Sequence, residues 1–188
     1  MDLPQIVPTL ETLRLSLRAF TLEDAPAVVA LMADGKISET TLMIPQSYAL
    51  EDAEGWIESH AQTALEADRY VFALTLKRGV LVGSFELMVN LRHARGELAY
   101  WLGTPFWGQG FTPEAGRAIL DWGFSSLPLE RVQAGVFVNN PSSARVQEKL
   151  GLTLEGRFRE YYRKNGVQLD SEVRSILRRE WEAGRLRN

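Results

Sequence analysis

Leucine alternates with arginine and serine along residues 13–17. This period of two predicts a strand that is buried on one face. Six later segments are also predicted as strands: 70–76, 80–89, 97–102, 131–138, 152–162 and 168–177. The connections at residues 77–79 and 165–166 contain glycine and are short, so they predict two β-hairpins.

Apolar residues recur with the period of a helix in four segments, which begin at Thr21, Glu51, Thr112 and Asn140. Thr21 and Asp24 have the spacing of a capping box at the start of the first helix. Thr112 is predicted as the N-cap of the third helix, with Pro113 in the first turn, where a missing N–H has no cost. Gly151 is predicted to end the fourth helix.

Two segments remain. Residues 34–49 are rich in Gly, Ser, Thr and Pro and are predicted as a loop or broken helix, and the residues from Arg178 as a charged helical tail. The order β-α-α-β-β-β-α-β-α-β-β predicts an α+β fold with a mixed, mostly antiparallel central sheet of about seven strands flanked by about four helices. With 188 residues, we expect a single domain that spans residues 1–188.

Composition narrows the function classes. A net charge of −3 gives no electrostatic basis for nucleic-acid binding. With no cysteine and only two histidines, the chain offers no disulfide, no thiol nucleophile and no basis for a zinc site. The N-terminus lacks the features of a signal peptide, and no apolar run reaches membrane-spanning length. We therefore expect a cytoplasmic protein with no metal, no nucleic-acid partner and no membrane partner.

The stretch 97–115 carries the strongest functional signal. A predicted strand is followed by a loop with Gly108 and Gly110, and then by the helix start at Thr112. The free N–H groups and the positive end of the helix dipole at such a junction suit an anion, above all phosphate. A dinucleotide fingerprint would need a third glycine where Pro113 stands, and the G-K-S/T triplet of a P-loop is missing. On the loop alone, a simple glycine turn stays open as the alternative.

The sequence W-G-Q-G-F-T-P-E-A at residues 107–115 resembles the coenzyme A pyrophosphate loop of the Gcn5-related N-acetyltransferases, the GNAT superfamily. Only Gly110 strictly matches the general loop pattern of the superfamily. The whole stretch, however, is similar to the loop of the ribosomal-protein N-terminal acetyltransferases (RimJ/RimL type). Further matches to this subfamily lie at residues 12–19, 140–143, 148–152 and 156–166, so the resemblance covers nearly the whole chain.

The resemblance implies a GNAT fold with acetyl-CoA (coenzyme A) as the cofactor. The N–H groups of residues 108–112 would hold the pyrophosphate, and the strand edge at residues 100–102 would pair with the pantetheine arm. One of these strand N–H groups would donate to the thioester oxygen. The predicted cofactor-binding residues are Tyr100, Trp101, Leu102, Trp107, Gly108, Gln109, Gly110, Phe111, Thr112, Asn140 and Ser143.

The resemblance also implies catalytic roles. Glu97 stands where the subfamily often has a carboxylate that deprotonates the acceptor amine through water; a solvated glutamate in a salt bridge is the alternative. Many members protonate the leaving thiolate with a tyrosine where this chain has Gln147, so Ser143 is the predicted substitute. Hydrogen bonding at the helix start is the other interpretation of Ser143. Tyr161 and Tyr162 are predicted to line the substrate-binding pocket, together with the loop after the first helix, although they could equally be core aromatics.

These inferences predict an acetyl-CoA-dependent N-acetyltransferase that modifies a primary amine by direct attack in a ternary complex. A protein N-terminal α-amine is the favoured acceptor. It titrates near ~8 and a lysine near ~10.4, so the α-amine needs less help from a base. The alternatives are a small-molecule amine (polyamine, amino acid or antibiotic) and a catalytically weak CoA-binding sensor module. We expect a monomer or a homodimer.

Overall fold

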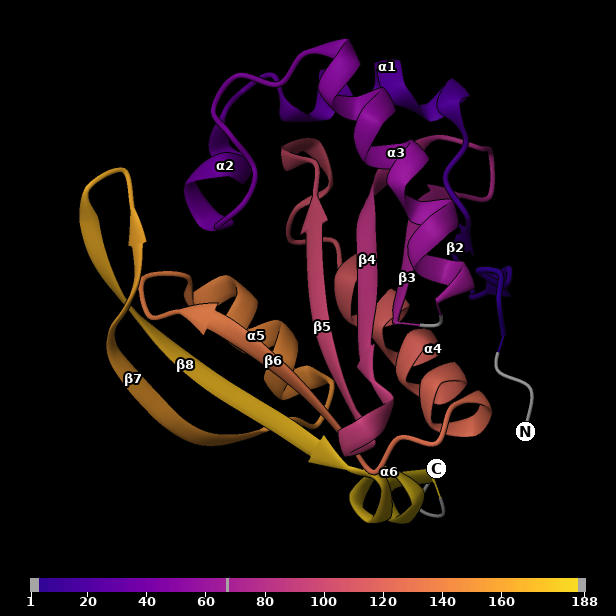
Figure 1. Ribbon diagram of the computed structural model, residues 1–188, viewed down its shortest axis with the longest axis vertical. Coiled ribbons are helices and arrows are strands. Elements are labelled where there is room, and N and C mark those ends of the chain that lie inside the picture. The colour runs from indigo at the N-terminus through magenta and orange to yellow at the C-terminus, as the bar shows by residue number, and fades with distance from the viewer. Residues whose placement is uncertain (1–3, 67, 186–188) are drawn as a thin grey trace.

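Eight strands and six α-helices make up the described part of the chain, residues 4–66 and 68–185 of the computed structural model (Figure 1). The strands are β1 (Leu10–Glu11), β2 (Leu15–Arg18), β3 (Arg69–Leu76), β4 (Leu81–Asn90), β5 (Arg95–Leu102), β6 (Arg131–Phe137), β7 (Thr153–Lys164) and β8 (Val167–Leu177). The α-helices are α1 (Ala25–Met32), α2 (Lys36–Thr40), α3 (Leu50–Leu65), α4 (Phe111–Ser126), α5 (Pro141–Lys149) and α6 (Arg178–Arg185). All predicted strands and helices are present, whereas β1 and α2 are too short to show a period in the sequence.

The strands form a single sheet in the order β1-β2-β3-β4-β5-β6-β8-β7. β5 and β6 are parallel, and every other neighbouring pair in this order is antiparallel. The predicted α+β class with a mixed, mostly antiparallel sheet is therefore confirmed. α6 is the helical tail that the sequence predicts after residue 177.

Two of the four predicted caps, Asn140 and Gly151, lie where the sequence predicts them. The capping box of Thr21 and Asp24 is also present, but it caps a 3-10 turn (Leu22–Asp24), and α1 follows with Asp24 as its N-cap. The Oδ1 of Asn140 accepts a hydrogen bond from the N–H of Ser143 (3.1 Å) and caps α5, and Gly151, with a φ of +84°, follows its end. The prediction that Thr112 caps α4 is wrong, because α4 begins at Phe111 and Gly110 is its N-cap, with a φ of +79°. Glycine adopts this left-handed conformation without side-chain strain, so the helix starts earlier than the Thr-Pro signal indicates.

The two faces of the sheet bury separate hydrophobic cores under the helices that cover them. α4 and α5 cover one face, where Ile119 is fully buried, and α1 and α3 cover the other, where Val28 is fully buried. Successive strand residues point to opposite faces. In β5, Tyr100 therefore packs against the α4–α5 core, and Trp101 packs against the α1–α3 core.

The two halves of the sheet separate between β5 and β6. Their parallel pairing covers three residue pairs, from Arg95 opposite Arg131 to Glu97 opposite Gln133. Beyond Glu97, β5 stays paired with β4 while β6 stays paired with β8, so the two strands diverge (Figure 1). We call the opening between residues 98–102 of β5 and residues 134–137 of β6 the split.

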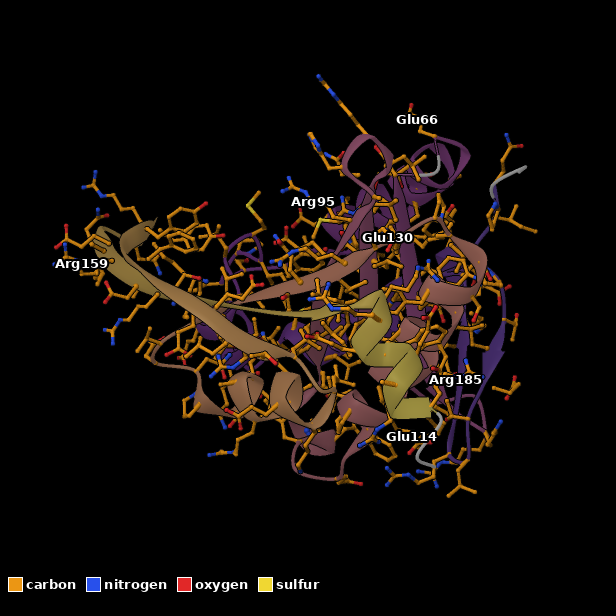
Figure 2. All side chains as sticks on the ribbon, turned by 90° about the horizontal axis from the view of Figure 1, so that it is seen from below. Glu66, Arg95, Glu114, Glu130, Arg159 and Arg185 are labelled. Carbon is orange, nitrogen blue, oxygen red and sulfur yellow. The ribbon has the colours of Figure 1, made fainter. Side chains whose placement is uncertain are left out.

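β7 and β8 form a long hairpin that projects from the rest of the molecule (Figure 1). Figure 2 shows the same projection from below, with Arg159 near the far end of the hairpin. The Lys164 ammonium donates hydrogen bonds to the carbonyls of Ser38 in α2 and of Thr41 just after it. These hydrogen bonds attach the β7–β8 hairpin to α2 and to the residue directly after it.

His60 of α3 lies in the α1–α3 core without a hydrogen-bond partner for either ring nitrogen in the described part of the chain. Its side chain is 7% exposed and packs edge-to-face against Trp56 and Phe20, with ring centroids 4.5 and 5.6 Å away. Burial lowers the pKa of His60 to about 4, and the charge of Arg69 acts in the same direction. The imidazole is therefore neutral in the folded protein over most of the acid range.

This burial predicts an acid sensitivity of folding. Below the ordinary pKa of 6.5 the unfolded chain protonates His60, but the folded chain does not until the pH approaches 4. Stability is therefore lost as the pH falls through this window. We expect His60→Phe to reduce the loss in the free energy of unfolding between about pH 7 and about pH 4.5 by ~2 kcal/mol. Urea unfolding at both pH values measures it, with the exposed His93→Gln as control. An unchanged loss in His60→Phe would show that His60 is not the sensitive group.

Candidate active site

The edge of β5 at the split presents unpaired backbone groups. The N–H of Gly103 donates to the carbonyl of Val82 in β4 (2.9 Å). Residues of an antiparallel strand turn their N–H and C=O alternately to one side and the other. The N–H and C=O of Tyr100 and the N–H of Leu102 therefore point away from β4 and into the split, while the C=O of Leu102 accepts a hydrogen bond from Trp107. An extended ligand can pair with such an edge as an added strand.

The loop that follows β5 forms an anion cradle at the start of α4. Gly108 and Gly110 have φ angles of +74° and +79°, and a side chain at Gly108 would meet nothing within 4 Å. Within residues 4–66 and 68–185, the N–H groups of Gly110, Phe111 and Thr112 donate no hydrogen bond. They point along the axis of a 16-residue helix, whose dipole favours negative charge at this end.

Arg14 and Glu114 fix this loop from outside. Arg14 donates from Nη1 to the carbonyl of Gln109 (2.8 Å) and from Nε to Glu114 (2.6 Å), and its guanidinium lies 4.5 Å from the centre of the Phe111 ring. Burial raises the pKa of Glu114, but hydrogen bonds from Thr12 and Arg14 outweigh it and hold that pKa below its usual value. The carboxylate thus stays ionised and holds the loop and the first turn of α4 in one position.

Several predicted cofactor-binding residues can act only through their backbone. The Gln109 side chain turns back to the carbonyl of Pro105 (2.9 Å), and the Phe111 ring is buried in the α4–α5 core. Trp101 packs near Trp56 on the opposite face. Trp107 is 46% exposed at the rim of the loop and donates from Nε1 to the carbonyl of Leu102 (2.6 Å).

A polar cluster lies on the α4–α5 side of the split. The Tyr100 hydroxyl is 2.7 Å from the Oγ of Ser143 in α5. Gln147, one turn further along α5, is fully buried and donates from Nε2 to the carbonyl of Gly135 (3.3 Å). Its Oε1 has no hydrogen-bond partner among the described residues. Asn140 caps α5, so the Ser143 hydroxyl is free of that task.

Glu97 belongs to a second polar network, on the α1–α3 side. Its Oε2 accepts a hydrogen bond from Nε2 of Gln133 (3.2 Å), and Oε1 of Gln133 accepts one from Arg131 (3.1 Å). Arg131 also binds both oxygens of Glu155 (2.5 and 2.6 Å), which lowers the pKa of Glu155 to about 2, with help from Ser175. Because Arg131 holds the amide oxygen, the amide nitrogen of Gln133 faces Glu97. Among the described residues Glu97 forms no ion pair, which disfavours the salt-bridge alternative.

The two predicted catalytic residues therefore approach the split from opposite faces. Glu97 lies at its closed end on the α1–α3 side, and Ser143 lies on the α4–α5 side. Tyr162 is on the Glu97 side, 5.7 Å from Phe137 by ring centroids, whereas Tyr161 is 56% exposed and stacks on Phe158. A molecule lying in the split would have a carboxylate on one side and two hydroxyls on the other.

The chain matches the family model "Acetyltransferase (GNAT) domain" over residues 14–153. It belongs to the GNAT acetyltransferase family. It is 31% identical over 175 residues to the uncharacterized N-acetyltransferase p20 of Bacillus licheniformis, covering 92% of this chain and 98% of p20. It is also 31% identical over 180 residues to the uncharacterized N-acetyltransferase YoaA of Bacillus subtilis (strain 168), covering 91% and 97%. Its fold is similar to that of the ribosomal alpha-N-protein acetyltransferase RimL in complex with coenzyme A (TM-score 0.84, 18% identity, covering 90% and 98%).

This GNAT protein is thus an N-acetyltransferase, and acetyl-CoA is its cosubstrate. Its residues fit that molecule. The free N–H groups of Gly110, Phe111 and Thr112 can hold the pyrophosphate, and the open edge of β5 can pair with the pantetheine arm. The buried, unpartnered Oε1 of Gln147 can accept a hydrogen bond from it. When bound, acetyl-CoA supplies an acetyl group activated as a thioester.

A metal site and a membrane-spanning helix each have requirements that the described residues do not meet. No group of three His, Asp or Glu side chains in this part of the chain is arranged to bind a metal ion. None of the helices described is long and apolar enough to cross a membrane.

Sequence reasoning missed the residues that hold the site together. Gln133 had one local signal, since it is a polar residue within an otherwise apolar strand. Arg14 and Glu114 had none, because they are 100 residues apart and meet only through the fold. The side-chain contact of Tyr100 with Ser143 has no signal in the sequence either, where only the place of Tyr100 on the strand edge marks it as a site residue.

The anion cradle predicts a specific loss of CoA binding. Gly110→Asp places a negative charge and a side chain among the N–H groups at the start of α4, so CoA affinity should fall at least about tenfold. Gly79→Asp is the matched control. Gly79 has a similar φ of +87° and so suffers the same backbone strain in a distant turn, where a side chain would meet nothing within 4 Å, whereas one at Gly110 would lie 3.5 Å from Nη2 of Arg14. Calorimetric titration with CoA measures both variants, and equal affinities for Gly110→Asp and the wild type would rule out the cradle.

Proposed function

We propose that this N-acetyltransferase acts on the α-amine at the N-terminus of a protein, as its resemblance to the ribosomal-protein N-terminal acetyltransferases implies. The environment of Glu97, the proposed base, is the observation that carries this. Its carboxylate lies at the closed end of the split, and its hydrogen-bond donor is the neutral amide of Gln133. An α-ammonium near ~8 gives up its proton more readily than a lysine near ~10.4, so it needs less help from a base at this position.

Each proposed step uses one side of the split. Glu97, directly or through water, takes the proton of the acceptor ammonium, so that the neutral amine can attack. A backbone N–H of β5 that faces the split donates to the carbonyl oxygen as negative charge develops there, an interaction worth ~2.7–4 kcal/mol. Ser143 donates a hydrogen bond to the sulfur as it leaves.

The lining of a cavity beside the β7–β8 hairpin supports a peptide acceptor over a polyamine. An open cavity of about 270 Å³ lies between the segment after α2 and the tip of the β7–β8 hairpin. Its lining in the described residues includes the apolar Leu42, Met43 and Ile44 and the basic Arg163 and Lys164, but no carboxylate. A polyamine carries several positive charges and would need carboxylates there. The main chain and apolar side chains of a peptide fit this lining better.

Tyr162 links this cavity with Glu97. Burial raises the pKa of Tyr162, and the charges of Tyr161 and Glu97 act in the same direction. Tyr162 directly precedes the cavity residue Arg163 in the chain. An acceptor that extends from the cavity to Glu97 would therefore pass Tyr162, which supports Tyr161 and Tyr162 as substrate-binding residues.

A catalytically weak CoA-binding sensor is the second candidate. The observation in its favour is that Gln147 stands where many members of the family carry an acidic tyrosine. Gln147 cannot donate a proton to a thiolate. The sensor would bind CoA with the same loop and edge but would release thiol only slowly with any amine.

The assignment of Glu97 as the base predicts a pH-dependent loss of turnover. Glu97→Gln should lower kcat by ~10²–10⁴ with little change in the KM for acetyl-CoA, and the loss should shrink as rising pH deprotonates the amine. Glu130→Gln, at an exposed carboxylate just before β6 (Figure 2), is the control and should keep wild-type turnover. A Glu97→Gln variant that matches the wild type at neutral pH would exclude the base role.

The acceptor class is tested by thiol release from acetyl-CoA with a panel of amines. Peptides with a free N-terminus should give the highest kcat/KM, and the same peptides acetylated beforehand at the N-terminus, with an internal lysine kept free, should be inactive. Faster release with spermidine, an amino acid or an aminoglycoside would contradict the peptide acceptor. Binding of CoA with only slow thiol release for every amine would instead identify the sensor.

A further inference from the structure

We infer that Tyr100 is a positioning residue for the leaving sulfur: its phenol donates to the Oγ of Ser143 and thereby turns the serine proton into the split. The inference rests on the proposed role of Ser143 and deepens it. Tyr100 comes from the central strand β5 rather than from α5, where the acidic tyrosine of many family members would stand.

The hydrogen bond itself is the first support. The two hydroxyl oxygens are 2.7 Å apart, and the carbonyl of Ser143 also lies 3.3 Å from the phenol oxygen. Both acceptors belong to Ser143, and we assign the phenol proton to the Oγ because that distance is the shorter of the two. With its Oγ occupied as an acceptor, Ser143 has its own proton free for a third atom. A hydroxyl that accepts a hydrogen bond is also a stronger donor.

The protonation state of Tyr100 fits this direction. Burial raises the pKa of the Tyr100 phenol, and its contacts with Ser143 and Gln147 and the charge of Arg174 oppose this rise only in part. The phenol therefore keeps its proton at neutral pH and remains a donor. A tyrosine of raised pKa is a poor acid, so a hydrogen-bonding role suits it better than transfer of its proton.

The start of α5 supplies the second support. The Oδ1 of Asn140 caps the N–H of Ser143, so the Ser143 side chain is not needed at the helix end. The Ser143 hydroxyl bonds instead to Tyr100, which is 43 positions away in the sequence, so this contact does not serve to cap the helix. The positive end of the α5 dipole lies at the same place and favours a developing anion.

Gln147 completes the cluster without competing for the proton. It is fully buried, and its Nε2 donates to the carbonyl of Gly135, which faces the split from β6. Gln147 is an amide at the position in α5 where many family members have a tyrosine. In this protein the phenol of the cluster belongs to Tyr100 of β5 instead. Arg174, which is buried and paired with Glu172 and Glu148, also acts through its charge to lower the pKa of the Tyr100 phenol, against the larger effect of burial.

The step balances as follows. The bond from the acetyl carbon to nitrogen forms, the bond from carbon to sulfur breaks, and its electron pair stays on the sulfur. Ser143 and Tyr100 stabilise this thiolate with two hydrogen bonds in series and lose no proton. Glu97 passes one proton of the ammonium to solvent before the attack and takes a second from the nitrogen after it. The thiolate takes a proton from water, and the hydroxide left behind is neutralised by the proton that Glu97 releases.

The test compares Tyr100→Phe, Ser143→Ala and the double variant, with any amine that the enzyme accepts. Tyr100→Phe should lower kcat about tenfold at an unchanged KM for acetyl-CoA. The double variant should be no slower than Ser143→Ala alone, because Tyr100 acts through Ser143. An acyl donor with a more acidic thiol should recover most of the loss. Tyr70→Phe, which removes another buried hydroxyl bonded to the carbonyl of Pro4 (2.7 Å), is the matched control and should keep its kcat.

A second readout needs no acceptor and so separates this inference from the proposed function. The ultraviolet absorbance of the thiolate gives the pKa of the thiol of bound CoA. This pKa should be lowest in the wild type, and both Tyr100→Phe and Ser143→Ala should raise it. Ser143→Ala carries the test if Tyr100→Phe does not fold. Wild-type titration of bound CoA in these variants, or losses of kcat that simply add in the double variant, would overturn the inference.

Discussion

The separation of β5 from β6 directly beyond Glu97 is the constraint on which the rest of the site depends. Each strand is held firmly on its other side, β5 by β4 and β6 by β8. Two carbonyls at the split are satisfied by side chains, that of Leu102 by Trp107 and that of Gly135 by Gln147. An unpaired buried carbonyl would cost about 1–3 kcal/mol, so these two donors allow the sheet to stay open in its middle.

An opening in a sheet also brings its two faces into contact with one ligand. Side chains of one strand alternate between faces, and an intact strand between them would keep Glu97 apart from Tyr100 and Ser143. At the split the carboxylate and the hydroxyls can act on the same molecule from opposite sides. Acetyl transfer needs this arrangement, because a proton leaves the nitrogen on one side while charge gathers on the sulfur on the other.

Sequence alone predicts those parts of the structure that depend on residues close together in the chain. The glycines at 108 and 110, the cap at Asn140 and the turn at 165–166 each act within a few residues, and the hydrophobic periods give seven of the eight strands in the described chain. The error at Thr112 has the same origin, since two cap signals lay two residues apart and the glycine prevailed.

The contacts that shape the site could not be predicted in this way. Glu97 meets Gln133 across 36 residues, Tyr100 meets Ser143 across 43, and Arg14 meets Glu114 across 100. Each depends on strand register or helix placement, which a single sequence does not specify.

Residue-resolved amide hydrogen exchange, measured by NMR with and without CoA, tests the central claim that the split and the loop after it hold the cosubstrate. The account predicts that exchange at Tyr100, Leu102 and Gly110 slows by at least about tenfold when CoA binds. Exchange at Ala99 and Trp101, which are bonded to β4, should change little. Protection confined to other parts of the chain, with none at the first three amides, would contradict the account.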